Sequence, residues 1–241
     1  MKKSALALAL ILASGTLAQA QFGGGLSLKK DSKPAVDADA VLANGSKLII
    51  FSTVATDLAV DSAVKMLEAF PASKVAGIKS KFAKYSELKG KRADKNQLDA
   101  DSCTVASDAF DEMAKLDVNG YEKAKAKVVV PAYGELGLAV AADGLAATQL
   151  PEFVKSGQST VSSLSSNPMQ AGKLVKLKAQ VVVANALITN TPKQVAAMKT
   201  VRGIAKKIAE AEHFKLGEPK LPTSIDADAL AKESKAVEVD G

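Results

Sequence analysis

The stretch KLVKLKAQVVVANALITNTPKQVAAMKTVRGIAKKIAEA, residues 173–211, decides the fold class of this chain. Apolar residues recur in it every three to four positions, a spacing typical of helices that bury one face. Asn190 interrupts the pattern, and Thr191-Pro192 then matches a helix N-cap followed by proline at the first helical position. We therefore predict two helices that form a tight antiparallel hairpin. Their buried faces contain Leu174, Leu177, Val181, Ala184 and Ile188 in the first helix and Val195, Met198, Val201, Ile204, Ile208 and Ala211 in the second.

A second periodicity competes with this interpretation. In residues 175–183 apolar side chains alternate with Lys176, Lys178 and Gln180, which is the period of a β-strand. Residues 123–130 alternate in the same way, and KAKVVV at 125–130 resembles KAQVVV at 178–183. Two paired strands, a duplicated helical hairpin or chance would each produce this match. Alanine is abundant on both sides and favours helix, so we predict helix for both segments and leave the strand alternative open.

The remainder of the chain extends the helical pattern. A first helix starts near Asp37, or at Ser46 after the Asn44-Gly45 break, and ends before Pro71. A short helix in 73–95 and a helix over 99–116 follow, and Gly120 stops the latter. The predicted buried faces are Val75, Ile78, Phe82 and Tyr85 in the short helix, and Val105, Ala109, Met113 and Leu116 in the next.

Prolines divide the Ala- and Val-rich region that comes next. We expect Pro131 to kink or split the helix over 121–149 and Pro151 to open a new one. The predicted fold is all-α, an irregular multi-helix bundle of antiparallel amphipathic helices over 37–216. A flexible Gly/Lys lead at 21–36 precedes it, and a polar, Pro-containing tail at 217–241 follows, with a short helix capped by Thr223 or Ser224.

Residues 1–20 have the three parts of a secretory signal peptide. Lys2 and Lys3 precede a short apolar run, and Ala18-Gln19-Ala20 places small residues before the cut. The run is shorter than the ~20 apolar residues that span a bilayer. We therefore expect cleavage after Ala20, a periplasmic or secreted protein, and no transmembrane helix in the mature chain.

Composition limits the classes of partner. The chain has 241 residues and a net charge of +6, which falls to +4 once Lys2 and Lys3 are removed. This mild excess suits an anionic surface, whereas the lack of Trp and the small number of Tyr and Phe argue against nucleic acid. The single cysteine, Cys103, excludes an internal disulfide. We interpret it as a small half-buried apolar residue, with an intermolecular disulfide as the alternative.

Residues for catalysis are scarce. His213 is the only histidine, and its place near a helix end favours a structural role. No nucleophile, zinc or phosphate-loop motif occurs, and the acids from Asp94 to Asp101 fail the EF-hand spacing. We predict no catalytic residue, no metal ligand and no cofactor.

Glu135 is the most suggestive single residue, because it interrupts the apolar run of residues 128–140. Asp143 follows two turns later, so both carboxylates point to nearly the same side of a helix. With Tyr133 from the same run, they are our candidate ligand-binding residues, in a groove that pairs a carboxylate with a cationic ligand or a lysine of the next hairpin. The alternative is an exposed polar stripe.

Two further surfaces are candidates for contact. Gly137, Ala141 and Gly144 form a seam of small residues that permits close approach of another helix. Lys199, Arg202 and Lys206 share one face of the last long helix and would contact an anion such as a lipid headgroup or an envelope polysaccharide. A merely solvated face is the alternative.

The sequence predicts an exported, non-enzymatic helical protein of the cell envelope. It would bind a macromolecular partner, such as an envelope protein, or an anionic lipid surface. The alternative function is a periplasmic carrier of an apolar small molecule or lipid inside the bundle. A membrane-active protein that inserts residues 128–150 is a third hypothesis, and Glu135 and Asp143 argue against it. An enzyme that uses those two acids comes last.

Overall fold

The computed structural model describes residues 37–92, 94 and 97–240. These residues form α-helices and short 3₁₀ turns without any strand, which confirms the predicted all-α multi-helix bundle. The expected signal peptide (1–20) and lead (21–36) lie outside the described residues. The α-helices are α1 (Ala38–Met66), α2 (Ala72–Lys91), α3 (Ala100–Met113), α4 (Val129–Leu164), α5 (Ala171–Ala211) and α6 (Ala227–Asp240).

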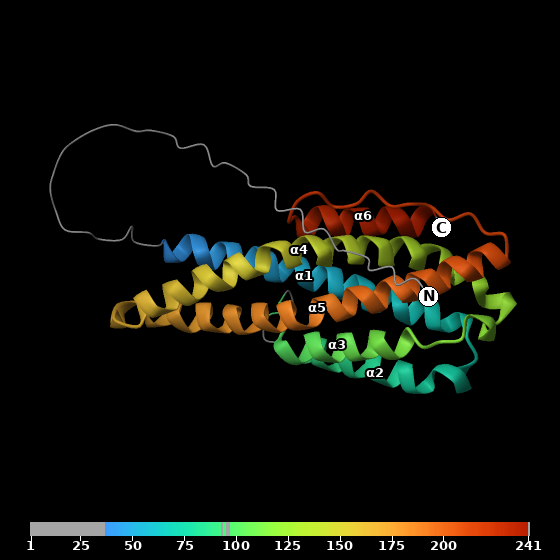
Figure 1. Cartoon of the computed structure of the whole chain (residues 1–241), viewed down its shortest axis with the longest axis horizontal. Helices are drawn as coiled ribbons and strands as arrows, with labels where there is room; N and C mark the ends of the chain where they lie inside the picture. Colours follow the sequence, from blue (N-terminus) through green and yellow to red (C-terminus); the bar gives the residue numbers. More distant parts are fainter. Residues whose placement is uncertain (1–36, 93, 95–96, 241) are drawn as a thin grey trace, which may run out of the picture. The chain divides into compact units, whose positions relative to one another are not determined.

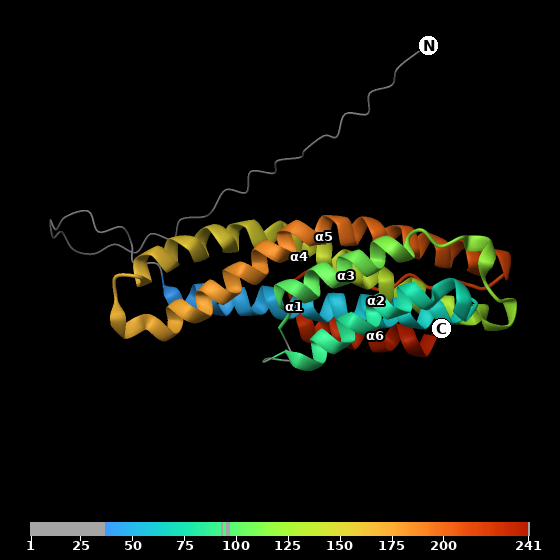
Figure 2. The ribbon, with the colours of Figure 1, turned by 90° about the horizontal axis from the view of Figure 1, so that it is seen from below.

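Three long helices, α1, α4 and α5, form the centre of the bundle (Figure 1). α4 and α5 are antiparallel and are joined by a short turn, and α1 packs against both. α3 lies along α5 and carries α2 on its outer side, whereas α6 packs on α1 and α4 (Figure 2). In both views the α4–α5 turn extends past the ends of α2 and α3.

The first helix begins where its acidic start predicts. The carboxylate of Asp37 accepts hydrogen bonds from the N–H groups of Asp39 and Ala40 at 3.0 and 3.3 Å, a typical N-cap. The alternative start at Ser46 is wrong, because α1 continues through Gly45. A Cβ there would collide with the ring of Phe153 and lie 2.6 Å from Oε1 of Gln180, so this glycine serves close helix packing and not a break.

The predictions at the prolines are wrong. Pro131 occupies the first turn of α4, where its missing N–H has no helical partner to lose, so it neither kinks nor splits the helix. Pro151 lies inside α4 and Pro192 inside α5. The expected hairpin at Asn190 is therefore one continuous helix. Thr191 is buried in the bundle, whereas Pro192 lies on the exposed side of the helix.

The short helices follow their apolar patterns to different degrees. The four apolar residues predicted for α2 are the ones it buries, Val75, Ile78, Phe82 and Tyr85. In α3 the buried face is rotated from the predicted stripe: Phe110 is buried and packs edge-on to Phe82, with ring centroids 5.3 Å apart, while Val105 is only partly buried. α3 also ends at Met113, before the predicted stop at Gly120.

A buried polar cluster ties α2 to α1. The hydroxyl of Tyr85 donates to Asp57 at 2.5 Å, and Nη2 of Arg92 donates to the Tyr85 oxygen at 2.8 Å. Lys89 adds an ion pair with Asp57 at 3.2 Å. These contacts compensate the burial of the Arg92 guanidinium, a group that costs free energy when it is buried alone.

Both segments with strand-like alternation are helical. Residues 123–128 form a 3₁₀ turn that leads into α4, and residues 175–183 belong to α5. Among the described residues, the segment Lys123–Leu164 is long and apolar enough to cross a membrane, and 61% of its most apolar window is buried in the bundle. The same composition is found in the core helices of soluble proteins.

The C-terminal region is more ordered than its polar sequence predicts. Residues 217–226 run back along the bundle and lead into α6, which extends well past the expected end near Ala231. Asp226, and not Thr223 or Ser224, accepts the N–H of Ala229 at 3.0 Å. Leu230 is buried, and Val237 fills the space above Gly134.

Candidate functional site

Arg202 of α5 is fixed against α4 by several contacts. Its guanidinium carbon lies 3.8 Å from the centroid of the Tyr133 ring, a cation–π arrangement. Nε donates to the backbone carbonyl of Tyr133 at 3.1 Å, and Nη2 donates to Glu218 at 2.6 Å. The Tyr133 hydroxyl donates to the other oxygen of the same carboxylate, also at 2.6 Å. The three side chains therefore form one rigid cluster.

This cluster forms one end of a groove between α4 and α5 with a volume of about 460 Å³. We call it the basic groove. Small residues leave its floor open, because Gly137, Ala141 and Gly203 place no bulky side chain there. Val140 and the half-exposed Leu221 add apolar walls. The lining residues are Tyr133, Gly137, Val140, Ala141, Lys199, Arg202, Gly203, Lys206, Glu218 and Leu221.

The groove keeps a positive charge despite the acid inside it. The hydrogen bonds from Tyr133 and Arg202 lower the pKa of Glu218, so this carboxylate is ionised and compensates Arg202. Burial and the hydrogen bond to Glu218 raise the pKa of Tyr133, which therefore stays a neutral donor. Lys199 and Lys206 are both exposed. Lys206 has a long contact with Glu210 at 3.8 Å, and its charge helps to lower the pKa of Glu218. Their charges are available to an anion.

The surrounding stretch of sequence has a strongly one-sided charge. Between Glu152 and Glu210 the chain contains no acidic residue and nine lysines and arginines. Eight of these cations belong to α5. The excess of positive charge on the whole protein is only +6, so acidic residues are concentrated on other segments. α5 is one of two strongly cationic helices, the other being α2 with six lysines and one acid.

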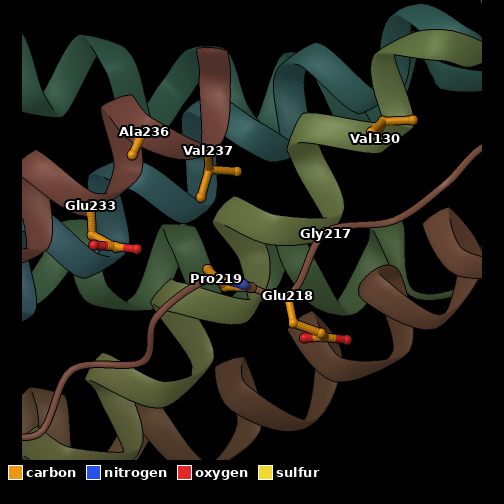
Figure 3. Close-up of a pocket in the computed structure, with 7 residues that line it drawn as sticks. All are labelled: Val130, Gly217, Glu218, Pro219, Glu233, Ala236 and Val237. Carbon is orange, nitrogen blue, oxygen red and sulfur yellow. The ribbon is translucent and has the colours of Figure 1, made fainter. Parts of the chain in front are cut away.

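A smaller pocket of about 110 Å³ adjoins the groove at Glu218. Val130 of α4 and Ala236 and Val237 of α6 line it, and Figure 3 shows residues 217–219 beneath them. The Glu218 side chain points away from this pocket toward the ribbon of α5. The pocket contains acids without any lysine or arginine in its lining, so its chemistry differs from that of the basic groove.

Glu135 does not line the basic groove. Its side chain is 1% exposed and faces α1, where Oε2 lies 2.5 Å from the Ser62 hydroxyl and Oε1 lies 3.5 Å from Nζ of Lys65. The sequence analysis predicted that a lysine of the next hairpin would pair with Glu135. The lysine comes instead from α1. The alternative of an exposed polar stripe also fails, because both Glu135 and Asp143 are buried.

Asp143 faces a different neighbour from Glu135. Its carboxylate accepts a hydrogen bond from Nε2 of Gln194 in α5 at 3.3 Å, whereas Glu135 faces α1. Burial raises the pKa of Asp143 to about 8. Eight residues of helix rotate a side chain by about 80°, which is enough to turn the two acids toward different helices. The structure therefore does not bring them together.

Cys103 lies in the same interior as Asp143. Burial, with the nearby charges of Asp99 and Asp143, raises the pKa of the Cys103 thiol to about 12. A thiol with that pKa is a poor nucleophile at neutral pH. Cys103 is more deeply buried than the sequence predicts, at 1% exposed.

The predicted seam of small residues has another role than helix packing. A Cβ at Gly137 would lie 3.1 Å from Nε of Arg202, so this glycine makes room for the guanidinium. Gly144 is exposed, and no heavy atom lies within 4 Å of its Cβ position. Close approach occurs instead at Gly157, where a Cβ would lie 2.7 Å from the side chain of Val181. Gly137 and Ala141 are part of the groove floor.

The basic groove therefore unites residues that the sequence analysis placed in separate groups. Tyr133, the two seam residues Gly137 and Ala141, and all three predicted cations line it. Sequence reasoning missed Glu218, Gly203 and Leu221. Glu218 and Leu221 follow α5 in a polar segment without periodicity, and only tertiary contacts identify them.

The fold and the groove define a class: an all-α protein with a cationic groove between two long antiparallel helices. Within the described residues, no group of three or more histidines, cysteines or acids is arranged to hold a metal ion. No model of a known protein family matches the chain, and no curated protein and no solved structure is detectably similar to it. The interpretation of the site therefore depends on its own chemistry.

Proposed function

We propose that the protein is an exported, non-enzymatic helical protein of the cell envelope that binds an anionic group through the basic groove. The group belongs to a macromolecular partner or to the membrane surface. One observation carries the proposal: Lys199, Arg202 and Lys206 line a single groove whose floor of small residues is open. Cations in a concave surface attract anions more strongly than isolated surface lysines do.

The state of Arg202 suggests how binding would occur. Its guanidinium is already oriented by the ring and the backbone carbonyl of Tyr133, so little side-chain entropy is lost when an anion arrives. The Glu218 side chain is 68% exposed, which lets it move aside for a phosphate or carboxylate. Lys199 and Lys206 would then complete the coordination of the anion, with the apolar walls at Val140 and Leu221 in contact with its organic part.

The placement of the other titratable groups favours binding over catalysis. The pKa values of Asp143 and Cys103 are strongly raised, but both groups lie inside the bundle and do not line the groove. His213 follows α5 with a φ of 59°. It does not line the groove either. A general acid or base must reach the substrate within hydrogen-bond distance.

The envelope location depends on the N-terminal sequence. The basic start, short apolar run and small residues before Gln21 are typical of an export signal. Anionic lipids and polysaccharides are abundant partners for a cationic groove in that compartment.

A titration with soluble anions tests the groove directly. Glycerol phosphate and polyphosphate, added to isotopically labelled protein, should shift the amide signals of Gly137 and Gly203. Lys199→Gln with Lys206→Gln should weaken polyphosphate binding at least about tenfold, since each lysine contributes on the order of 1 kcal/mol. The matched control, Lys79→Gln with Lys84→Gln, removes the same charge from exposed positions of α2 and should bind normally. Equal weakening by both pairs would show only a general charge effect and would contradict the proposal.

A further inference from the structure

The most exposed apolar side chains of the described residues gather away from the basic groove. Five large apolar side chains are exposed, and three of them lie on the α4–α5 turn and the first half of α5. Met169 is 96% exposed, Val175 67% and Val182 59%. Val175 and Val182 are seven residues apart, so they lie on one face of the helix, with the exposed Ala179 between them. We call Met169, Val175 and Val182 the apolar stripe.

The apolar stripe lies on the part of α5 that α2 and α3 do not cover. α3 begins at Ala100, and close to that end Asn190 of α5 donates to Thr104 at 3.5 Å. Val175 and Val182 precede this contact in the sequence. The beginning of α5 extends past α2 and α3 (Figures 1 and 2). The exposure of the stripe therefore follows from the length of α5 relative to α3.

Lysines predominate around the stripe, where Lys173 pairs with Asp39 of α1 at 2.6 Å. Lys176 and Lys178 are exposed beside it, and the nearest acidic residues along the chain are Glu152 and Glu210. Lysine stems can lie along an apolar surface while the ammonium groups reach outward. Apolar side chains surrounded by lysines are the combination that binds anionic bilayers from the side, with the apolar groups in the headgroup region.

We propose that the α4–α5 turn and the first half of α5 dock on an anionic lipid bilayer, with Met169, Val175 and Val182 entering the headgroup region. A second copy of the chain fits this face less well, because Lys176 and Lys178 of the two surfaces would repel each other. The docking surface is separate from the basic groove, which lies at the other end of α5. The two proposals can therefore fail independently.

Vesicle co-sedimentation tests the docking with the full mature chain. The chain should bind vesicles of mixed phosphatidylglycerol and phosphatidylcholine and leave pure phosphatidylcholine vesicles largely unbound. Val175→Ser with Val182→Ser should weaken binding about tenfold or more, because two apolar side chains no longer leave water. Lys176→Gln with Lys178→Gln should weaken it about fivefold per lysine and reduce its dependence on salt. All of these positions are exposed, so the helical circular-dichroism signal should be unchanged.

A charge variant outside both surfaces provides the control. Lys79→Gln with Lys84→Gln removes the same charge from exposed positions of α2 and should leave vesicle binding within about twofold if the stripe makes the contact. Undiminished vesicle binding by the serine variant would overturn the proposal, as would equal binding to both kinds of vesicle. A dimer in light scattering that the serine variant abolishes would show that the stripe joins two copies, and would also overturn it.

Discussion

The two halves of α5 differ in what covers them, although neither contains an acidic residue before Glu210. The first half (171–190) extends past α3 and leaves Val175 and Val182 in water. The second half (191–211) lies between α3 and α4, and its cations line the basic groove. Composition alone does not distinguish the halves. The packing of neighbouring helices decides which part of this cationic helix offers an apolar stripe and which part offers a groove.

Asp143 of α4 accepts a hydrogen bond from Gln194 and so helps to anchor the second half of α5. We expect the largest change in stability when Asp143 is replaced. Its pKa is about 8 in the folded state against an ordinary value of 3.8. Between these values the folded protein holds a proton that the unfolded chain has lost, so stability falls as pH rises. The slope is about 1.4 kcal/mol per pH unit, and Asp143→Asn should remove this fall. Wild type should lose up to about 4 kcal/mol more than the variant between about pH 5 and about pH 8.

Urea unfolding of both proteins across that range provides the measurement. The difference between the two curves isolates Asp143 from the other titrating groups. Parallel curves would mean that Asp143 is ionised in the folded bundle, and the anchoring through Gln194 would then need a different explanation.

Gly45 tests the close packing around the first half of α5. Gly45→Ala places a Cβ against the ring of Phe153 and 2.6 Å from Oε1 of Gln180, a residue of that half. We expect a loss of about 2 kcal/mol, typical of overpacking in a core. Gly203→Ala is the control from the second half, where no heavy atom lies within 4 Å of the Cβ position. It should stabilise the helix by up to about 1 kcal/mol. Thermal unfolding measures the stability of both variants. A Gly45→Ala protein as stable as wild type would contradict the tight packing around Gly45.

Arg202 gives the smallest expected change in stability. Arg202→Lys removes the stacking on Tyr133 and cannot reproduce both the Nε and the Nη2 hydrogen bonds. The cost should be about 1 kcal/mol, since Glu218 is largely exposed and its ion pair is screened. Lys207→Gln, at an exposed position of the same helix, should stay within about 0.5 kcal/mol of wild type. If both variants unfold alike, the Arg202 cluster contributes no rigidity to the groove.

The sequence predicted the fold class well because local patterns determine it. The face of α2 was predicted residue by residue, since the spacing of Val75, Ile78, Phe82 and Tyr85 has a single helical interpretation. Prolines caused the main errors. Thr191-Pro192 is a good helix start in local terms, but a long helix tolerates an internal proline when packing on both sides holds it. No local signal separates these two cases.

The candidate site was predicted only in part for a related reason. The common face of Lys199, Arg202 and Lys206 follows from helical spacing, but the approach of Tyr133 and Glu218 depends on how α4 and the segment after α5 pack. For Glu135 and Asp143 the sequence analysis grouped two residues that the structure separates. Their spacing suggested one shared groove, and the presence of α1 on one side and α5 on the other separates them.

Crosslinking in the exporting cell tests the central claim, that the groove of the second half binds an anionic partner. A photoreactive side chain in place of Ala141 on the groove floor should capture a lipid or an envelope macromolecule. Capture should fall strongly with Lys199→Gln and Lys206→Gln and persist with Lys79→Gln and Lys84→Gln. No adduct from Ala141, or an adduct that is indifferent to Lys199 and Lys206, would contradict the account.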